Sequence, residues 1–271
     1  MLTILLLFAF NVVAPAEMVC VGSVQSSAVP REIYIAGVEQ EGILTLASTG
    51  QIIYLNGPSV SKLKPGSVHR VIRPEGKVKN PSSGEKLGTY YKHIGTIRVE
   101  VVDAESATAK VMLSCQAMAK GDVVVPDTPR QAVSIPDNFS NERTQIPRDG
   151  LVGSIVLGMN DLRELASGHY CFIGLGQRDG VRVGDQFTVF RPYPNFNTRD
   201  MSVLGGGANK SYASARDYSY RFELNSLLRK RILPTQILGD IVVIETGNGV
   251  STGKIVNSLF EMHPGDLVIK K

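Results

Sequence analysis

The chain carries one sequence pattern twice, and this internal repeat limits the folds that it can adopt. Residues 95–124 match residues 239–268 without a gap and at a constant offset. Self-similarity on this scale indicates a duplicated structural unit. The identical pairs are Gly95/Gly239, Ile97/Ile241, Val99/Val243, Thr108/Thr252, Lys110/Lys254, Ser114/Ser258, Met118/Met262, Gly121/Gly265, Asp122/Asp266 and Val124/Val268.

The similarity continues toward the N-terminus, so that each unit has the size of a small domain. The second copy contains an insertion, because the segment between Pro192 and Gly239 is much longer than the segment between Pro74 and Gly95. A one-residue adjustment keeps the two copies aligned as far as an Arg-Pro pair. The matched segments are Leu46-Ala47-Ser48 with Leu165-Ala166-Ser167, 51–57 with 170–176, 63–67 with 181–185, and Arg73-Pro74 with Arg191-Pro192.

Both units consist of short apolar runs rich in β-branched residues, separated by Gly, Pro, Asn and Ser, which is the pattern of short strands. We therefore expect a mainly β protein with two tandem homologous small β-barrel or sandwich domains and one helix inserted in the second. A length of 271 residues accommodates two such domains. The expected divisions are a signal peptide at 1–16, a short N-terminal segment at 17–30, the first β-domain at 31–126, a Pro-rich linker at 127–150, and the second β-domain at 151–271 with the insertion at 193–236.

A four-residue turn signal recurs twice in each unit and ends with Ser or Asp. Gly stands at its third position, where a type II turn needs a positive φ, and an apolar run follows each turn. The aspartates of these turns are therefore interpreted as structural before they are interpreted as catalytic. The four turns are Lys64-Pro65-Gly66-Ser67, Ala119-Lys120-Gly121-Asp122, Arg182-Val183-Gly184-Asp185 and His263-Pro264-Gly265-Asp266.

The N-terminus predicts export. Residues 2–13 are nearly all apolar, and Ala14-Pro15-Ala16 places small residues where a signal peptidase reads them, so we expect cleavage before Glu17. The alternatives are a buried strand or a membrane anchor, but a span needs about twenty apolar residues. Glu17 also makes the sequence before Cys20 a poor lipoprotein signal. We expect a periplasmic or extracellular protein of the bacterial envelope, with no transmembrane span after cleavage.

Three cysteines in an exported chain cannot all pair within it. Cys115 aligns with Leu259 in the other copy and Cys171 aligns with Ile52, both apolar positions. The favoured interpretation is that these thiols are small buried hydrophobic side chains, and a disulfide is the alternative.

Motifs for catalysis, metals and cofactors are weak. Residues 249–254 resemble a phosphate-binding loop, but the matching residues 105–110 of the first copy lack its glycines, so a strand start is the better interpretation. The Gly-rich segment 205–211 also departs from that motif. His69, His93, His169 and His263 have no second ligand at metal-binding spacing. We expect no enzyme, no catalytic residue, no metal and no cofactor.

The insertion is the best candidate for function, because the other copy has no counterpart to it. Residues 215–231 have an approximate helical apolar spacing and end in basic residues before Pro234. Tyr and Arg are enriched at binding hot spots. The alternative is that the aromatic rings pack this helix onto the second domain while the cations stay solvated. The candidate binding residues are Tyr212, Arg216, Tyr218, Tyr220, Arg221, Arg229 and Lys230.

Each unit resembles a known module in the order of its turns and strands. The order begins with Gly, a strand, the turn Lys-Pro-Gly-Ser or Arg-Val-Gly-Asp, and a strand that ends in Arg-Pro. It continues with Leu-Gly, a strand, Ala-Thr-Ala-Lys, a strand, Lys-Gly-Asp and a last strand. The run 78–88 is especially similar. This pattern is similar to the β-rich region that follows LysM repeats in some bacterial envelope proteins, and to the C-terminal domain of the periplasmic flagellar assembly protein T. The chain has no recognisable LysM repeat. The resemblance implies a non-catalytic envelope role and transfers no active-site residue.

The expected function is an exported scaffold or adaptor that binds another envelope protein, in a surface or flagellar assembly. The alternative is a module that binds peptidoglycan or another polysaccharide. A net charge of +4 is too small for a chain built to bind nucleic acid through a dense basic face.

Overall fold

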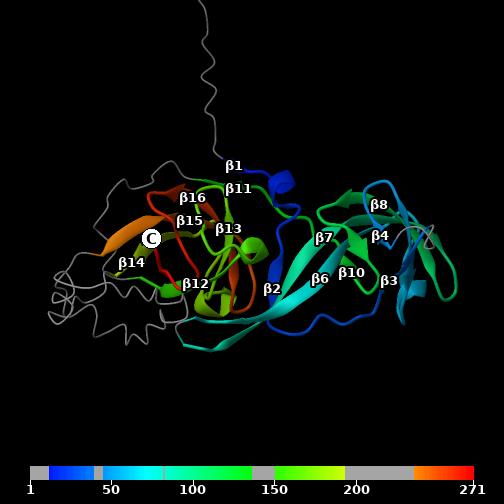
Figure 1. Ribbon diagram of the computed structural model, residues 1–271, viewed down its shortest axis with the longest axis horizontal. Coiled ribbons are helices and arrows are strands. Elements are labelled where there is room, and N and C mark those ends of the chain that lie inside the picture. The colour runs from blue at the N-terminus through cyan, green and yellow to red at the C-terminus, as the bar shows by residue number, and fades with distance from the viewer. Residues whose placement is uncertain (1–11, 40–44, 82, 136–149, 193–234) are drawn as a thin grey trace, which may run out of the picture.

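The computed structural model describes residues 12–39, 45–81, 83–135, 150–192 and 235–271. These residues form two six-stranded β-barrels side by side, which confirms the mainly β prediction and the tandem domains (Figure 1). The predicted inserted helix lies outside the described residues. Within them, the helices are short 3-10 turns: η1 (Pro15–Met18), η2 (Val60–Lys62), η3 (Met159–Asp161) and η4 (Gln177–Asp179).

Barrel 1 closes through pairing of β7 with β8, after the strand order β7-β6-β10-β3-β5-β8. Strand β2 (Ser23–Gln25) adds to the outside of β7, and β4 (Leu46–Ala47) pairs with β9 (Met118–Ala119). The barrel strands are β3 (Tyr34–Val38), β5 (Ile52–Asn56), β6 (Val68–Lys79), β7 (Lys86–Val102), β8 (Ala107–Ser114) and β10 (Val123–Pro126).

Barrel 2 has the same topology, with β15-β14-β17-β12-β13-β16 in the places of the barrel 1 strands. The repeated sequence therefore corresponds to a repeated fold. A small ladder of β1 (Val12–Val13) and β11 (Val133–Ser134) lies outside both barrels. The barrel 2 strands are β12 (Val152–Gly158), β13 (Tyr170–Ile173), β14 (Gln186–Arg191), β15 (Gln236–Thr246), β16 (Ser251–Ser258) and β17 (Leu267–Lys270).

Strand register corrects the alignment of β5 with β13 by one residue. Phe172 lies opposite Thr252, and Tyr54 lies opposite Thr108. Because the two threonines are equivalent, Phe172 corresponds to Tyr54. Side chains alternate between faces along a strand, so this shift exchanges inside and outside. The expected alignment of Cys171 with Ile52 was therefore wrong by one residue.

The same correction applies to the Leu-Ala-Ser segments. Cys171 occupies the position of Ile53, and both side chains are fully buried inside their barrels. Ala47 pairs with Met118, and Leu165 pairs with Met262. The two copies therefore align without the one-residue adjustment. The recurrence of Leu-Ala-Ser does not mark equivalent positions.

Each barrel core contains one close approach between a glycine and a methionine. A Cβ on Gly95 would collide with the Met118 side chain and a backbone carbonyl of β8, and a Cβ on Gly239 would do the same with Met262 and β16. Both methionines are fully buried. Close packing tolerates no added atom there without a shift of the strand. This contact explains why both residue types recur in both copies.

A buried ion pair joins the Arg-Pro segment of each copy to its last turn. Arg73 binds Asp122 through Nε–Oδ1 (2.7 Å) and Nη2–Oδ2 (2.8 Å). Arg191 binds Asp266 with the same two distances. Both carboxylates are almost fully buried. A bidentate arginine–carboxylate pair is strong and geometrically specific, so it fixes the strand that precedes the arm or insertion to the strand that closes the barrel.

The predicted turns are confirmed. Gly66, Gly121, Gly184 and Gly265 have φ of 84°, 86°, 91° and 106°, which only glycine adopts easily. Each fourth residue donates its N–H to the first carbonyl, at 3.0 to 3.2 Å. The carboxylates of Asp122 and Asp266 also accept a backbone N–H of their own turn. These aspartates are structural, as expected.

The segment that resembles a phosphate loop is a β-hairpin turn. The Gly247 N–H donates to the Val250 carbonyl at 2.8 Å, and β16 starts at the next residue. In barrel 1, the Asp103 N–H makes the equivalent bond to Ser106, also at 2.8 Å. The interpretation as a strand start is therefore confirmed.

Replacing Asp122 by Ala leaves the Arg73 guanidinium without its partner in a partly buried site. We expect the free energy of unfolding to fall by about 2–4 kcal/mol, since breaking a buried ion pair costs more than an exposed one. Asp266→Ala in barrel 2 should have a similar effect. Denaturant unfolding measures both, with the exposed Glu100→Ala as the control; losses no larger than that of the control would contradict the role of the pair.

Candidate functional site

The sequence-predicted binding residues lie outside the described residues, so the structure does not place Tyr212, Arg216, Tyr218, Tyr220, Arg221, Arg229 or Lys230. It does place the ends of their segment. Arg191 at the end of β14 lies opposite Gln236 at the start of β15, so the insertion leaves and re-enters barrel 2 at one point. The candidate functional site that the described residues do show is the joint between the barrels.

An extended hairpin of barrel 1 forms one side of this joint. Strands β6 and β7 continue beyond the barrel wall, from the pair Pro74–Tyr91 to the pair Lys79–Lys86. We call residues 74–91 the arm. It lies against barrel 2, where β12 and β13 face it (Figure 1). The arm connects the same two strands in barrel 1 that the insertion connects in barrel 2.

The joint has an apolar centre. Tyr90 of the arm and Phe172 of β13 meet with ring centroids 5.1 Å apart and planes tilted by 60°. Tyr90 is 2% exposed and Phe172 is fully buried. Burying each such ring contributes about 1.5–3 kcal/mol, and the tilted pair adds about 0.5–1.5 kcal/mol. The surrounding apolar side chains are Val24, Val78, Leu87, Val156 and Val250.

Polar contacts surround this centre and contribute less. Arg178 Nη2 of barrel 2 lies 2.9 Å from Glu85 Oε1 of the arm, but both side chains are about half exposed. Ion pairs as exposed as this one contribute little to stability, because water and salt screen them. The Asn160 N–H donates to the Tyr90 hydroxyl at 3.4 Å. The apolar contact therefore holds the joint, while the polar contacts fix its orientation.

A groove of about 270 Å³ opens beside Tyr90, between the arm and β12. Its charged side chains are Glu75, Lys77, Lys79 and Asp161. Asn160 and Asp161 have φ near 60°, the left-handed region, and are alone in this among the non-glycine residues that the structure describes. Strained residues of this kind concentrate at functional sites. Here the strain positions the backbone N–H that binds Tyr90, so we assign it to the joint.

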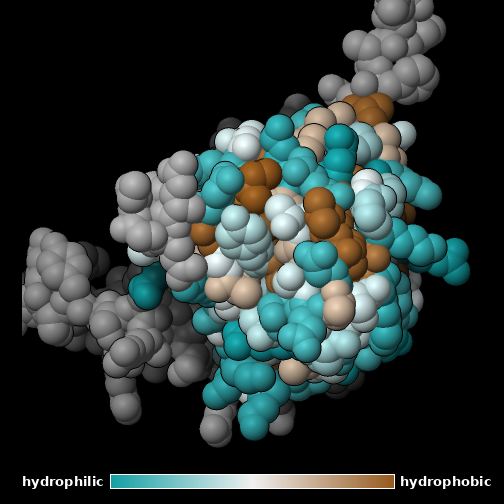
Figure 2. Space-filling model, turned by 90° about the vertical axis from the view of Figure 1, so that its right-hand side faces the viewer, coloured by the Kyte–Doolittle hydropathy of each residue, from teal (hydrophilic) through white to brown (hydrophobic). Residues whose placement is uncertain are grey.

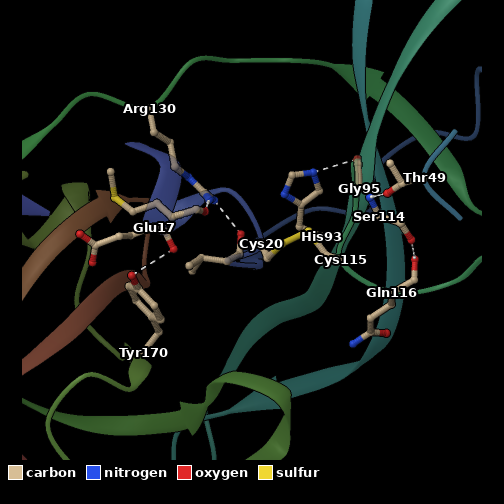
Figure 3. Close-up of a disulfide and its surroundings, with 12 residues drawn as sticks. Glu17, Cys20, Thr49, His93, Gly95, Ser114, Cys115, Gln116, Arg130 and Tyr170 are labelled. Carbon is tan, nitrogen blue, oxygen red and sulfur yellow. Dashed lines mark hydrogen bonds between the residues drawn. A yellow bond between two sulfur atoms is a disulfide. The ribbon is translucent and has the colours of Figure 1, made fainter. Parts of the chain in front are cut away.

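The N-terminal segment 17–29 passes over both barrels and ties them together, and we call it the strap. Cys20 forms a disulfide with Cys115 of barrel 1 (Figure 3). The expectation that Cys115 is a free buried thiol was wrong, because Cys20 lies outside the repeated sequence and the alignment of Cys115 with Leu259 could not reveal it as a partner. The Cys171 interpretation is confirmed: this cysteine is free and fully buried.

The strap is anchored on barrel 2 without a covalent bond. Met18 and Val21 pack on Val242 and Ile244 of β15. The Tyr170 hydroxyl donates to the Glu17 carbonyl at 3.2 Å (Figure 3). All these strap residues follow the expected cleavage point. The strap therefore joins barrel 1 by a disulfide and by the pairing of β2 with β7, and it joins barrel 2 by packing and hydrogen bonding.

Arg130, just after barrel 1, completes this anchor. Its guanidinium binds Glu245 of β15, with Nη2–Oε2 at 2.7 Å, and donates to the carbonyls of Met18 and Val21. Its side chain is 9% exposed. One cation therefore holds the strap, the start of the predicted linker and barrel 2 together. Sequence reasoning missed Arg130 because its partners are distant in sequence and two are backbone atoms.

Buried titratable groups in this region are held in their neutral forms. His93 lies beside the disulfide, and its Nε2 donates to the Gly95 carbonyl at 2.9 Å (Figure 3). Burial, with help from Arg70 and Arg130, lowers the pKa of His93 to about 4. Burial also raises the pKa of Tyr90 and raises the pKa of the Cys171 thiol to about 12. A thiol of this kind is unreactive at neutral pH.

Within the described residues, no group of three His, Cys, Asp or Glu side chains could hold a metal ion. In the same part of the chain, no helix has the length and apolar character needed to cross a membrane. Chemically, the joint combines a desolvated aromatic pair with fixed polar contacts, which is the composition of a protein interface.

No protein-family model matches the chain, and no curated protein matches its sequence.

Phe172→Ala removes the ring at the centre of the joint, whereas Tyr54→Ala removes the equivalent ring in barrel 1, which is 42% exposed. We expect the first change to lower the free energy of unfolding by about 3–5 kcal/mol, because large-to-small changes in a core leave a cavity. The second should change it by less than about 0.5 kcal/mol. Denaturant unfolding in dilute solution measures both, and equal effects would contradict the assignment of the joint.

Acid should weaken the fold through His93. Its folded-state pKa of about 4 lies below the unfolded value of 6.5. The unfolded chain therefore binds the additional proton between these values, and stability present above pH 6.5 is lost as the pH falls toward 4. The shift corresponds to roughly 3 kcal/mol. Unfolding of His93→Gln at pH 7 and pH 4.5 should show a smaller loss than the wild type; an unchanged loss would assign the acid sensitivity to other groups.

Proposed function

We propose that the protein is an exported, non-catalytic scaffold or adaptor of the bacterial cell envelope that binds another envelope protein, in a surface or flagellar assembly. The observation that carries this proposal is the use of one loop position for contact between domains. Between β6 and β7, the arm docks on a neighbouring barrel. Between β14 and β15, the chain inserts residues 193–234 at the same position. Because this loop position already makes a contact between domains in barrel 1, we infer that residues 193–234 bind a partner at the same position in barrel 2.

Two features support the exported location. Disulfides persist in oxidising compartments such as the periplasm and are rare in the cytosol. The Cys20–Cys115 disulfide joins residues 95 positions apart and anchors the strap. The apolar N-terminus, with small residues before Glu17, is typical of a secretory signal.

The use of the repeated polar residues supports a non-catalytic role. Arg73 with Asp122 and Arg191 with Asp266 make the same bonds in both barrels. A charged pair that recurs in every copy of a fold serves the fold. The functional difference between the copies is then expected in the parts that differ, which are the arm and the insertion.

Affinity capture from the native envelope tests the adaptor role. We expect the wild-type protein to retain an envelope protein, and a variant with residues 193–234 replaced by a short glycine-rich turn to lose it. Arg191 and Gln236 are paired neighbours, so such a turn can close the hairpin. Retention of the partner by the shortened variant would contradict a role for the insertion.

Sedimentation with purified cell wall tests the alternative. Under the adaptor proposal, the protein stays in the supernatant unless its partner protein is added. Direct sedimentation with peptidoglycan that disappears in the shortened variant would favour a polysaccharide-binding module instead. Circular dichroism of both proteins checks that the two barrels remain folded.

A further inference from the structure

The outer wall of barrel 1 has an uncovered surface at the place where barrel 2 receives the arm. In barrel 2, the arm covers Phe172, which stands opposite Thr252. The equivalent row in barrel 1 runs from Tyr54 on β5 across Thr108 on β8 to Val101 on β7. Tyr54 and Val101 are 42% and 52% exposed. We call this row, together with Asp103 and Glu105 of the adjoining turn, the receiving face.

The receiving face combines apolar and acidic groups. The β7–β8 turn carries Asp103 and Glu105, and Glu100 precedes Val101; all three carboxylates are exposed. Asn56 Nδ2 donates to the Glu105 carbonyl at 3.1 Å, which fixes the turn beside the apolar row. Figure 2 shows this end of the molecule, where apolar patches reach the surface between hydrophilic side chains.

The repeat indicates what covers this face. Barrel 2 receives the segment that connects β6 to β7. The corresponding segment of barrel 2, residues 193–234, connects β14 to β15. It contains seven Lys and Arg residues against three Asp and Glu residues, so its net charge is +4. Opposite charge on the two surfaces favours their encounter and fixes their register.

Position in the molecule argues for contact between copies. Figure 1 shows β14 at one end of the molecule and β3 and β8 at the other. Residues 193–234 are therefore attached to barrel 2 at a point far from the receiving face of barrel 1 in the same molecule. An equivalent face on a second copy has no such constraint. An interface between two different surfaces of one chain is heterologous, and it continues from copy to copy until a ring closes or a fibre forms.

We propose that the receiving face of barrel 1 binds residues 193–234 of a second copy, so that copies associate head to tail. This inference rests on the proposed adaptor function and identifies one partner as the chain itself. The contact repeats between molecules the docking that the arm makes within one molecule.

Sedimentation velocity of the full chain over a range of concentrations tests this proposal. We expect reversible association that weakens with salt, because part of the attraction is between exposed charges. Tyr54→Ala should weaken it about tenfold or more, as truncation of an interface aromatic residue does. Val183→Ala is the control, since Val183 is also exposed, at 50%, but lies in a turn of barrel 2. Glu105→Lys should weaken association more than Glu164→Lys, an exposed acid of barrel 2.

Mixing two defective variants gives the sharpest test. Tyr54→Ala keeps the segment and loses the face, whereas the variant shortened at 193–234 keeps the face and loses the segment. At a concentration where the wild type is associated, each variant alone should be mostly monomeric. Together they should form a one-to-one dimer that grows no further, because only one productive interface can form. Circular dichroism of both variants verifies the fold.

Three results would overturn the proposal: a wild-type chain that stays monomeric, association that either change leaves as strong as in the wild type, or a mixture that stays monomeric. A fourth result would also overturn the proposal: the wild type is monomeric, and Tyr54 reacts with a chemical label in the shortened variant but not in the wild type. That result would place residues 193–234 on the receiving face of the same molecule. Capture from the envelope separates the two claims. If the wild type retains a different envelope protein but does not self-associate, the adaptor function stands and head-to-tail association fails.

Discussion

The buried arginine–carboxylate pair is the constraint on which each barrel depends. It connects the end of the strand before the arm or the insertion to the turn before the last strand, two points that lie far apart along the chain. The same carboxylate also accepts a backbone N–H of its turn, so a single side chain fixes both the turn and the neighbouring strand. The variable segments therefore begin at a rigid point. This arrangement allows one copy to carry a short hairpin and the other a long insertion without a change in the barrel.

The two barrels share their interior and differ on their outer walls. At the position of Tyr54 and Phe172, both copies have an aromatic ring that points away from the core. In barrel 2 the arm and the strap desolvate this wall, and in barrel 1 the wall is exposed. Docking of the arm on barrel 2 thus covers the outer wall of one copy and leaves the equivalent wall of barrel 1 exposed.

Sequence predicted the elements that local chemistry decides. The positive φ of Gly66 and Gly121 follows from turn composition, and the repeated strands follow from β-branched runs between turns. The side of the strand to which a residue points was harder to predict. A shift of one residue in the alignment placed Ile53, instead of Tyr54, at the position of Phe172. Only the hydrogen-bonded register between strands resolves that difference.

Long-range contacts were beyond the reach of sequence. The Cys20–Cys115 disulfide joins the barrel to a segment outside the repeated sequence, so comparison of the copies could not predict it. Arg130 binds two backbone carbonyls and Glu245, which lies 115 residues away. No local pattern specifies such partners. The candidate binding residues in the insertion stay a prediction.

The position of the strap near the start of the chain has a consequence for the order in which the two barrels fold. Both cysteines of its disulfide, and every strand of barrel 1, lie before residue 127. Barrel 1 and its disulfide need no residue beyond 126, so barrel 1 can fold and hold the strap in place before barrel 2 folds. The later barrel then folds against a surface that already exists, with the arm and the strap as its template. Because the strap and the arm are already in place, barrel 2 does not have to find barrel 1 by free diffusion of two separate domains.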